Sequence, residues 1–414
     1  MLPLVARAGY LPFHPSGWYF CCGPSDHRPD MRKIRSFRFV FLLLLLGSTV
    51  ALAATKRWSP EKANQWYAQQ PWPVGANFAP STAINQLEMW QADSFDPVTI
   101  DREFGWAQEI GFNTMRVFLH NLLWQQDATG FQARMDKFLT IADKHGISVT
   151  FVLLDGVWDP HPVLGKQRDP RPHVHNSGWL QAPGAELLDH PERWDTELKP
   201  YVEGVIRRFG KDRRILMWDL FNEPDNTNDS YARQETRQKE RRALDLLQKT
   251  FTWAREADPD QPLTSGVWKG DWSRNDKLGP VARVQLKNSD VITFHNYDPL
   301  NSMQQHVGWL ERFHRPIVCT EYMARPRGST FQSILPWLKQ QKIGAYNWGF
   351  VSGKTQTIYP WDSWEKKYTA EPAVWFHDIF LKDGRPYDPK EVTLIKRLTR
   401  KSIHRQGLEK HSMR

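Results

Sequence analysis

Eight short apolar runs recur along this chain, and amphipathic stretches separate them. Each run has the length of one buried strand, and the stretches between the runs carry apolar residues at helical spacing. This alternation predicts an α/β fold in which strands and helices follow one another. The expected strands are residues 74–78, 113–118, 148–154, 216–222, 263–267, 291–295, 317–321 and 345–348.

The clearest helical patterns lie between these runs, at residues 100–110, 131–145, 198–209 and 233–257. Breakers such as Gly111, Gly146 and Pro259 follow several of them. Eight strand–helix units over about 300 residues suit a single-domain (β/α)8 TIM barrel, which needs about 250 residues plus insertions. The structural alternative is a doubly wound open sheet, but no glycine-rich phosphate loop follows the first run.

One connection is much longer than the others. It follows the third strand, from Asp155 to about Lys199, and it contains Trp158, Trp179 and Trp194. A loop after a barrel strand projects from the carboxyl end of the strands, where barrel active sites lie. The chain has 20 Trp in 414 residues. We therefore expect this loop to form a wall of a binding cleft, with the alternative that it is a surface insertion that only packs.

The N-terminal segment has the pattern of an export signal. Basic residues after Met31 precede an apolar stretch from Val40, which closes with Ala51-Leu52-Ala53. This pattern predicts a signal peptide at residues 31–53, cleaved after Ala53, and hence a periplasmic or extracellular protein. Residues 1–30 fit no targeting pattern and are interpreted as an upstream extension before the true start. The alternative is an uncleaved signal that anchors the protein. Cleavage is favoured, because the apolar run is short for the roughly 20 residues of a membrane span.

The remaining chain is expected to divide into a catalytic domain at residues 54–395 and a basic C-terminal tail at residues 396–414. Despite this basic tail, no nucleic-acid partner is expected for an exported protein. With the segment before Ala54 removed, Cys319 has no disulfide partner and is expected to be a small core residue.

Metal and serine-hydrolase chemistry lack their usual motifs. His161, His173 and His175 provide three imidazoles, but neither a helical HExxH pattern nor paired cysteines accompany them. The chain also lacks the GxSxG motif of a serine nucleophile. We therefore expect no metal site and no cofactor.

Two glutamates end two of the expected strands. Glu223 follows the fourth apolar run in Asn222-Glu223-Pro224, and Glu321 ends the seventh run. Pro224 cannot extend a hydrogen-bonded ladder, so the fourth strand should stop there. Alternation along this strand predicts that Met217, Asp219, Phe221 and Glu223 share one face. In a barrel the ends of the fourth and seventh strands face each other across the mouth, which would place the two carboxylates around one bond.

Hydrolysis of a glycosidic bond requires such a pair. One carboxylic acid protonates the leaving oxygen, while a carboxylate attacks or stabilises the anomeric carbon. Burial and a neighbouring like charge raise the pKa of the acid, so that it is protonated when the substrate binds.

This arrangement resembles the retaining glycoside hydrolases of the cellulase family, within the large clan of (β/α)8 glycosidases. The resemblance covers roughly residues 72–380, and it implies that Glu223 is the acid/base and Glu321 the nucleophile. It also implies that Asn222 binds the sugar 2-hydroxyl. Arg116, near the end of the second strand, matches the arginine beside the nucleophile.

The resemblance extends to three further residues and departs at one position. His295 and Tyr297 match the family's His-x-Tyr element after the sixth strand, and Trp348 matches its stacking tryptophan after the eighth. The family's histidine after the third strand is not evident here, and Asp155 is expected to serve that subsite instead. Trp158 in the long loop is a further candidate for contact with the sugar.

The sequence thus predicts a secreted retaining glycoside hydrolase that cleaves β-linked poly- or oligosaccharides of the mannan, glucan or xylan type. The alternative is a carbohydrate-binding pseudoenzyme with the same barrel. A barrel lyase or isomerase is disfavoured, because neither a phosphate site nor a Schiff-base lysine is evident. The sugar, the choice between internal and terminal cleavage, and the oligomeric state stay open.

Overall fold

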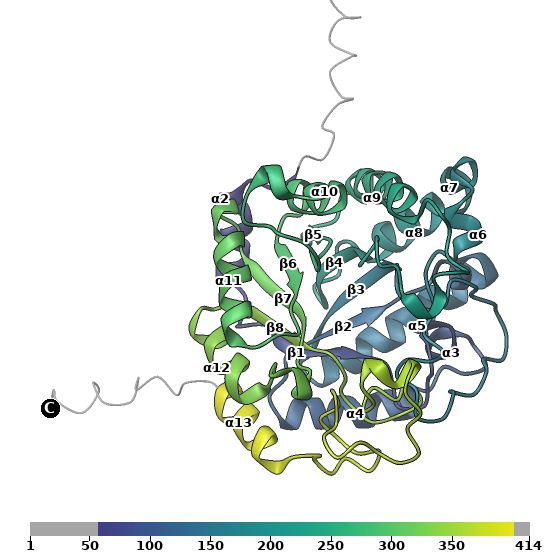
Figure 1. The fold of residues 1–414 in the computed structure, drawn as a ribbon. Coiled ribbons are helices and arrows are strands. Elements are labelled where there is room, and N and C mark those ends of the chain that lie inside the picture. The colour runs from purple at the N-terminus through teal and green to yellow at the C-terminus, as the bar shows by residue number, and fades with distance from the viewer. Residues whose placement is uncertain (1–56, 401–414) are drawn as a thin grey trace, which may run out of the picture. The chain divides into compact units, whose positions relative to one another are not determined.

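The computed structural model describes residues 57–400, which fold around eight parallel strands (Figure 1). The strands are Val74–Phe78 (β1), Thr114–Phe118 (β2), Ser148–Asp155 (β3), Ile215–Asn222 (β4), Leu263–Thr264 (β5), Ile292–His295 (β6), Ile317–Tyr322 (β7) and Gly344–Asn347 (β8). Their hydrogen-bonded order is β5-β4-β3-β2-β1-β8-β7-β6. A parallel bridge between Val267 and Phe294 joins the two ends of this sheet. The predicted single-domain (β/α)8 barrel is therefore confirmed.

Helices surround the strands and alternate with them along the chain (Figure 1). Side chains at the preceding position cap several of them; for example, Asp96 accepts a hydrogen bond from the amide of Thr99 at the start of α4. The helices are Pro60–Ala68 (α2), Gln86–Trp90 (α3), Pro97–Glu109 (α4), Asn121–Lys144 (α5), Ala185–Leu188 (α6), Trp194–Glu197 (α7), Lys199–Phe209 (α8), Lys239–Glu256 (α9), Pro280–Asn288 (α10), Leu300–Leu310 (α11), Phe331–Gln340 (α12) and Pro389–Thr399 (α13).

Three element boundaries differ from the sequence prediction for local reasons. Strand β5 ends at Thr264, because the amide of Ser265 donates to the Ser289 hydroxyl instead of the sheet. Helix α5 begins ten residues before the predicted start, with a non-helical kink at Asp127. Helix α9 begins later than predicted, since the residues before Lys239 form turns.

The C-terminal boundary also differs from the prediction. Helix α13 continues to Thr399, beyond residue 395 where the domain was expected to end. The Thr399 hydroxyl donates to the carbonyl of Ile110, at 2.8 Å, and Ile395 is fully buried. Residues 396–399 therefore belong to the packed domain. The remainder of the predicted tail lies outside the described residues, as do the upstream extension and the signal peptide. Among residues 57–400, no helix has both the length and the apolar character required to cross a membrane.

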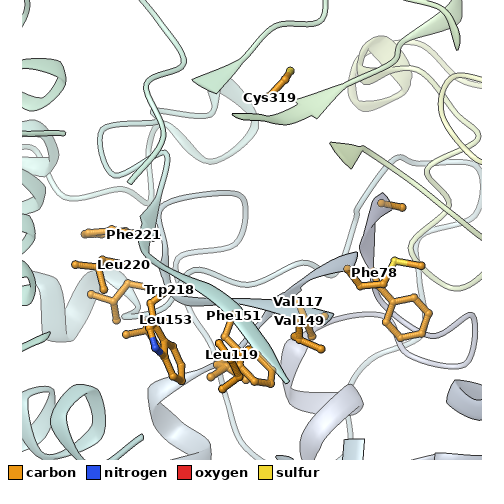
Figure 2. Close-up of a cluster of buried hydrophobic side chains, with 14 of the residues drawn as sticks. Phe78, Val117, Leu119, Val149, Phe151, Leu153, Trp218, Leu220, Phe221 and Cys319 are labelled. Atoms are coloured by element: carbon orange, nitrogen blue, oxygen red, sulfur yellow. The ribbon is translucent and has the colours of Figure 1, made fainter. Parts of the chain in front are cut away.

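Buried side chains form two layers, one between the strands and the helices and one inside the barrel. The outer layer packs strand side chains such as Phe151 and Trp218 against the helices (Figure 2). Inside the barrel, Met217, Val318 and Tyr346 belong to a second cluster. The Tyr346 hydroxyl lies within hydrogen-bonding distance of the hydroxyls of two inward-facing threonines, Thr114 and Thr150. Packed side chains thus fill the barrel interior below the carboxyl ends of the strands.

Strand β4 departs from strict alternation near its end. Phe221 belongs to the outer cluster together with Leu220, its neighbour in Figure 2, whereas Asn222 points to Arg116 inside the barrel. The prediction that Phe221 shares a face with Met217 and Asp219 is therefore wrong. The cause is that side chains stop alternating regularly between the two faces at the end of this strand, whereas the prediction assumed regular alternation throughout. This change turns Asn222 towards the mouth of the barrel.

Candidate active site

The two predicted glutamates meet at the carboxyl ends of β4 and β7. Glu321 lies within β7, and Glu223 directly follows β4 with a left-handed backbone, φ 40°. This region is uncommon for a residue other than glycine, so the surrounding contacts must hold the turn in place. A carboxylate oxygen of Glu223 and one of Glu321 lie within 4.8 Å of each other. Both side chains are buried, as expected for residues at the base of a cleft.

Arg116 holds Glu321 from below. Its Nη1 donates to Glu321 Oε1 at 2.7 Å, and its Nε and Nη2 donate to Asp219 Oδ2 at 3.0 and 2.8 Å. Nη1 also donates to the Asn77 side chain, at 2.8 Å. All of these groups are buried from water, so the charges of the guanidinium and the carboxylates are balanced by one another and not by solvent. The structure places Arg116 beside Glu321, as the resemblance implies.

His295 and Tyr297 contact the glutamates from β6 and the loop that follows it. The Tyr297 hydroxyl donates to Glu321 Oε2 at 2.7 Å. His295 Nδ1 lies 2.7 Å from Glu223 Oε1 and 3.5 Å from Glu321 Oε2. The histidine ring therefore lies between the two carboxylates and contacts the expected acid more closely.

The two glutamates have different electrostatic surroundings. Burial raises the pKa of Glu223 to about 7, although a hydrogen bond from Asn226 and the charge of Arg116 lower it. Burial also raises the pKa of Glu321, against the lowering effects of His295, Arg116 and the Tyr297 hydroxyl. Burial lowers the pKa of His295 to about 4, so this ring is neutral at neutral pH. Glu223 can thus carry a proton near pH 7, and among residues 57–400 no cationic side chain donates a hydrogen bond to its carboxylate.

Asn222 faces the cleft, and Asp155 supports it from behind. Asn222 Oδ1 accepts from Arg116 Nη2 at 2.7 Å, and its Nδ2 donates to Asp155 Oδ1 at 3.0 Å. Asp155 Oδ2 also accepts from the indole of Trp179, at 2.8 Å. Asp155 is 1% exposed and does not line the cleft. The expectation that Asp155 serves a sugar subsite directly is therefore wrong, because its oxygens are already used to orient Asn222 and Trp179.

Above the glutamates lies a cavity of about 280 Å3 whose walls are rich in tryptophan. The predicted Trp158 and Trp348 line it. Flat aromatic faces around two buried carboxylates fit a ligand with both apolar faces and polar edges, such as a sugar ring. The tryptophans that line the cavity are Trp158, Trp179, Trp268, Trp348 and Trp361.

The long loop after β3 contributes to this cleft as expected, although not with every tryptophan. Trp158 and Trp179 line the cavity, whereas Trp194 is buried and donates to the backbone of Leu187. Of the other tryptophans near strand ends, Trp90 belongs to the outer core and Trp124 packs against that core.

Several residues of the site were missed by the sequence analysis, and Asn226, Asn77 and Trp361 are three of them. Asn226 Nδ2 donates to Glu223 Oε2 at 2.6 Å, and Asn77 contacts Arg116. Trp361 comes from the loop after β8 and lies near Tyr297, with a ring-centroid separation of 5.2 Å. The position of Asn77 near the end of the first strand was a usable signal. Asn226 and Trp361 lie in loops, where strand periodicity gives no direction.

One group of side chains in the described part of the chain has the geometry to hold a metal ion. It consists of Glu223, His295 and Glu321, whose ligand atoms all lie within 4.8 Å of one another. Arg116 next to this group would repel a cation. The histidines of the long loop do not form a second such group: His173 contacts the Tyr359 hydroxyl and His175 contacts the Tyr359 carbonyl.

Comparison with known proteins identifies relatives of this barrel. The sequence model of the cellulase family, glycosyl hydrolase family 5, matches residues 83–354. Among solved structures, the chain is similar to the hyperthermostable endo-1,4-β-D-mannanase from Thermotoga petrophila RKU-1, at 16% identity and a TM-score of 0.50. That alignment covers 79% of this chain and 98% of the mannanase.

Two further structures show the same barrel. One is a β-mannanase from the blue mussel Mytilus edulis, at 15% identity and a TM-score of 0.50, covering 80% of this chain and 92% of that one. The other is GH5_18 from Streptomyces cattleya in complex with Manb1-4GlcNAc, at 13% identity and a TM-score of 0.53, covering 80% and 81%. No curated protein matches the chain. At these identities the structural likeness shows the fold alone.

Proposed function

The chain belongs to the cellulase family, glycosyl hydrolase family 5, and from this premise we propose that it is an exported retaining hydrolase of β-linked poly- or oligosaccharides. Membership in this family makes it a glycoside hydrolase. The observation that carries the retaining mechanism is the approach of a Glu223 oxygen to a Glu321 oxygen, within 4.8 Å. Retaining enzymes have carboxyl groups about 5–5.5 Å apart, while inverting enzymes need about 6.5–9.5 Å to admit a water molecule.

In the first step Glu321 attacks the anomeric carbon, and Glu223 gives its proton to the glycosidic oxygen. The bond between the anomeric carbon and this oxygen breaks as the glycosyl ester with Glu321 forms. Arg116 and Tyr297 hold the two oxygens of Glu321 by hydrogen bonds and so fix their direction. The raised pKa of Glu223 keeps the required proton available near neutral pH.

In the second step Glu223 acts as a base. Ester formation removes the negative charge of Glu321, which lowers the cost of a negative charge on Glu223. Glu223 then takes a proton from water, whose oxygen attacks the anomeric carbon and releases Glu321. No cofactor takes part in either step.

The aromatic cleft supports carbohydrate as the substrate. Mannan, glucan and xylan types all remain candidates, and β-mannosides come first because two of the similar structures are mannanases. The pattern of residues 31–53 supports export to the periplasm or the exterior, and N-terminal sequencing of the mature protein would find Ala54 first.

The proposal is tested with aryl β-glycosides and oligosaccharides of mannose, glucose and xylose. We expect turnover with retained anomeric configuration, seen by NMR in the first product formed. Glu321→Ala and Glu223→Ala should each lower kcat by roughly 10²–10⁴-fold or more. Glu240→Ala, a change at an exposed glutamate of α9, is the matched control and should retain activity.

Added azide distinguishes the roles of the two glutamates. In Glu223→Ala, azide should attack the glycosyl-enzyme and give a β-glycosyl azide. In Glu321→Ala, azide should attack the β-glycoside directly from the face that Glu321 occupies in the wild type and give an α-glycosyl azide. Turnover that survives both substitutions would exclude the two-glutamate mechanism. Binding of oligosaccharides without any turnover would favour the pseudoenzyme.

A further inference from the structure

One side of the cleft is closed by loops that bind one another. The loop after β3, residues 156–198, and the loop after β8, residues 348–388, meet across the mouth of the barrel. The amide of Asn176 donates to the Thr355 carbonyl at 2.8 Å, and the amide of His175 donates to the Ser363 hydroxyl at 3.0 Å. Trp158 stacks on Trp364 with a centroid separation of 5.3 Å and an interplanar angle of 10°. We call residues 156–198 and 348–388 together the loop wall.

The segment after β1 fastens this wall to the barrel. The side chain of Asn85 donates to the carbonyl of Gly178, at 3.0 Å, and the amide of Lys354 donates to the carbonyl of Ser81, at 3.1 Å. Lys354 also forms an ion pair with Glu88 of α3. Connections after three strands, β1, β3 and β8, are thus tied together by backbone and side-chain contacts. Such a wall is a fixed part of the fold.

Little space remains beyond the cleft on this side. Asn176, Trp179 and Trp348 line the main cavity and also border a second, adjacent cavity. The second cavity measures about 20 Å3, compared with about 280 Å3 for the first. A single buried water needs roughly 10–15 Å3 on this scale, so the second cavity has no room for a sugar ring.

The chemistry assigns the closed side to the non-reducing end of the substrate. Because Glu223 protonates the leaving oxygen, the leaving group lies on the side where Asn226 and Trp268 follow β4 and β5. The sugar that is attacked lies on the other side, against Trp348, which follows the strand next to Glu321. Its far edge then meets the loop wall.

Asn176 is a polar residue of the loop wall that lines this part of the cavity. It lines the cavity, is 1% exposed and has a left-handed backbone, φ 46°. Neither its Oδ1 nor its Nδ2 has a hydrogen-bond partner among the described residues. A buried amide without partners is costly, and a small rotation of this side chain towards the cavity would let a ligand supply the missing donor and acceptor. A sugar hydroxyl is both.

We propose that the enzyme is exo-acting: it removes one sugar at a time from the non-reducing end, and Asn176 binds the terminal 4-hydroxyl of that sugar. This inference rests on the proposed hydrolase function and adds the position of cleavage. A sugar attached to the 4-oxygen would have to occupy the space filled by the loop wall. Chain ends therefore fit the cleft, and internal linkages do not.

The position of cleavage is tested with the wild-type enzyme. The substrates are β-1,4-linked pentasaccharides of mannose, glucose and xylose that carry a fluorescent label at the reducing end. At early times we expect only a labelled tetrasaccharide and a free monosaccharide. Methylation of the 4-hydroxyl at the non-reducing end should slow cleavage at least 100-fold. Labelled di- or trisaccharides at early times, or equal cleavage of the methylated chain, would overturn the proposal.

The role of Asn176 is tested with a 4-deoxy aryl β-glycoside of the sugar that the wild type prefers. For the wild type, loss of the 4-hydroxyl should lower kcat/KM about tenfold. Asn176→Ala should lower kcat/KM on the parent glycoside by a similar factor, with no further loss on the 4-deoxy compound. A purely structural role would leave the full tenfold loss in the variant, and this result would contradict the assignment.

Asn121→Ala is the matched control, because Asn121 is also a buried asparagine with an unpartnered side-chain oxygen among the described residues, but it does not line the cavity. It should keep the wild-type ratio between the two glycosides. A failure of the exo proposal is distinguishable from a failure of the hydrolase proposal. Internal cleavage that still depends on Glu223 and Glu321 overturns only the exo proposal, whereas the absence of any glycoside turnover overturns both.

Discussion

At the scale of single residues, the protonation of Glu223 is set by a balance between burial and one amide. Burial raises its pKa to about 7, while Asn226 donates to Oε2 and favours the ionised form. Glu321 is within 4.8 Å, so the two carboxyl groups titrate as a coupled pair. The enzyme needs a proton on Glu223 to begin the reaction. We therefore expect kcat/KM to fall as the pH rises through an apparent pKa of about 7.

Asn226→Ala tests this balance. Removal of the amide withdraws a hydrogen bond from the ionised carboxylate, so the pKa of Glu223 should rise and the alkaline limb should move to higher pH. The measurement is the pH profile of kcat/KM on an aryl β-glycoside, for the variant and the wild type. Asn228→Ala changes another asparagine of the same loop, which also lines the cavity but whose side-chain oxygen accepts from the amide of Ser230, and it should leave the limb in place. A limb that moves to lower pH in Asn226→Ala would contradict this account.

The position of a side chain close to a strand end could be predicted from the sequence. Glu223, Glu321 and Arg116 could be placed because the ends of parallel strands converge at one edge of a barrel. Asn226 and Asn176 could not be placed in this way. The direction of Asn176 depends on a hydrogen bond to Thr355, almost 180 positions away, and no local pattern contains that contact.

At the scale of elements, helix α4 is joined to the loop after β1 by a buried carboxylate. Glu103 accepts hydrogen bonds from the amide of Ser81, at 3.2 Å, and from its hydroxyl, at 2.5 Å. Burial raises the pKa of Glu103 to about 7. The folded protein therefore holds this proton more tightly than the unfolded chain does. The stabilisation that protonated Glu103 gives to the folded protein is fully present below about pH 4.5 and is lost as the pH rises to about 7.

Glu103→Gln should remove this pH dependence. The free energy of unfolding of the variant, relative to wild type, should increase between pH 5 and pH 8 by an amount on the order of 3 kcal/mol. Denaturant unfolding at both pH values measures this change. Glu109→Gln, at the exposed end of the same helix, should show no such change. An equal effect of Glu103→Gln at both pH values would exclude the titration of Glu103 as the cause.

At the scale of the whole molecule, the barrel was predictable and the loops above it were not. Eight apolar runs were sufficient for the strands, since burial on both faces leaves a continuous apolar pattern. The errors are local: β5 is shorter because Ser265 bonds outside the sheet, and Phe221 breaks the alternation of β4. The loop wall depends on contacts between distant segments, so the sequence could indicate that the loop after the third strand borders the cleft, but not which contacts hold it in place.

Arg325 links the loop wall to the C-terminal helix through a buried ion pair and hydrogen bonds. Arg325, after β7, pairs with Glu391 in the first turn of α13, at 2.6 Å. The same guanidinium donates to the carbonyls of Trp375, His377 and Asp378 in the loop after β8. The two side chains are 7% and 4% exposed. Loss of one partner would leave the other charge buried without compensation, which costs about 3–5 kcal/mol.

Glu391→Ala should therefore destabilise the protein by about that amount and should also weaken catalysis. The catalytic loss follows because the loop that Arg325 holds carries Trp361, which lines the cleft. Denaturant unfolding measures the first effect, and kcat/KM at a temperature where the variant stays folded measures the second. Lys390→Ala, a change at the exposed neighbour in the same helix, should affect neither. If Glu391→Ala lost stability but kept the wild-type kcat/KM, the cleft would be independent of this ion pair, and the contacts that remain in the variant, from Arg325 to the carbonyls of the loop after β8 and from this loop to the long loop after β3, would be sufficient to position Trp361.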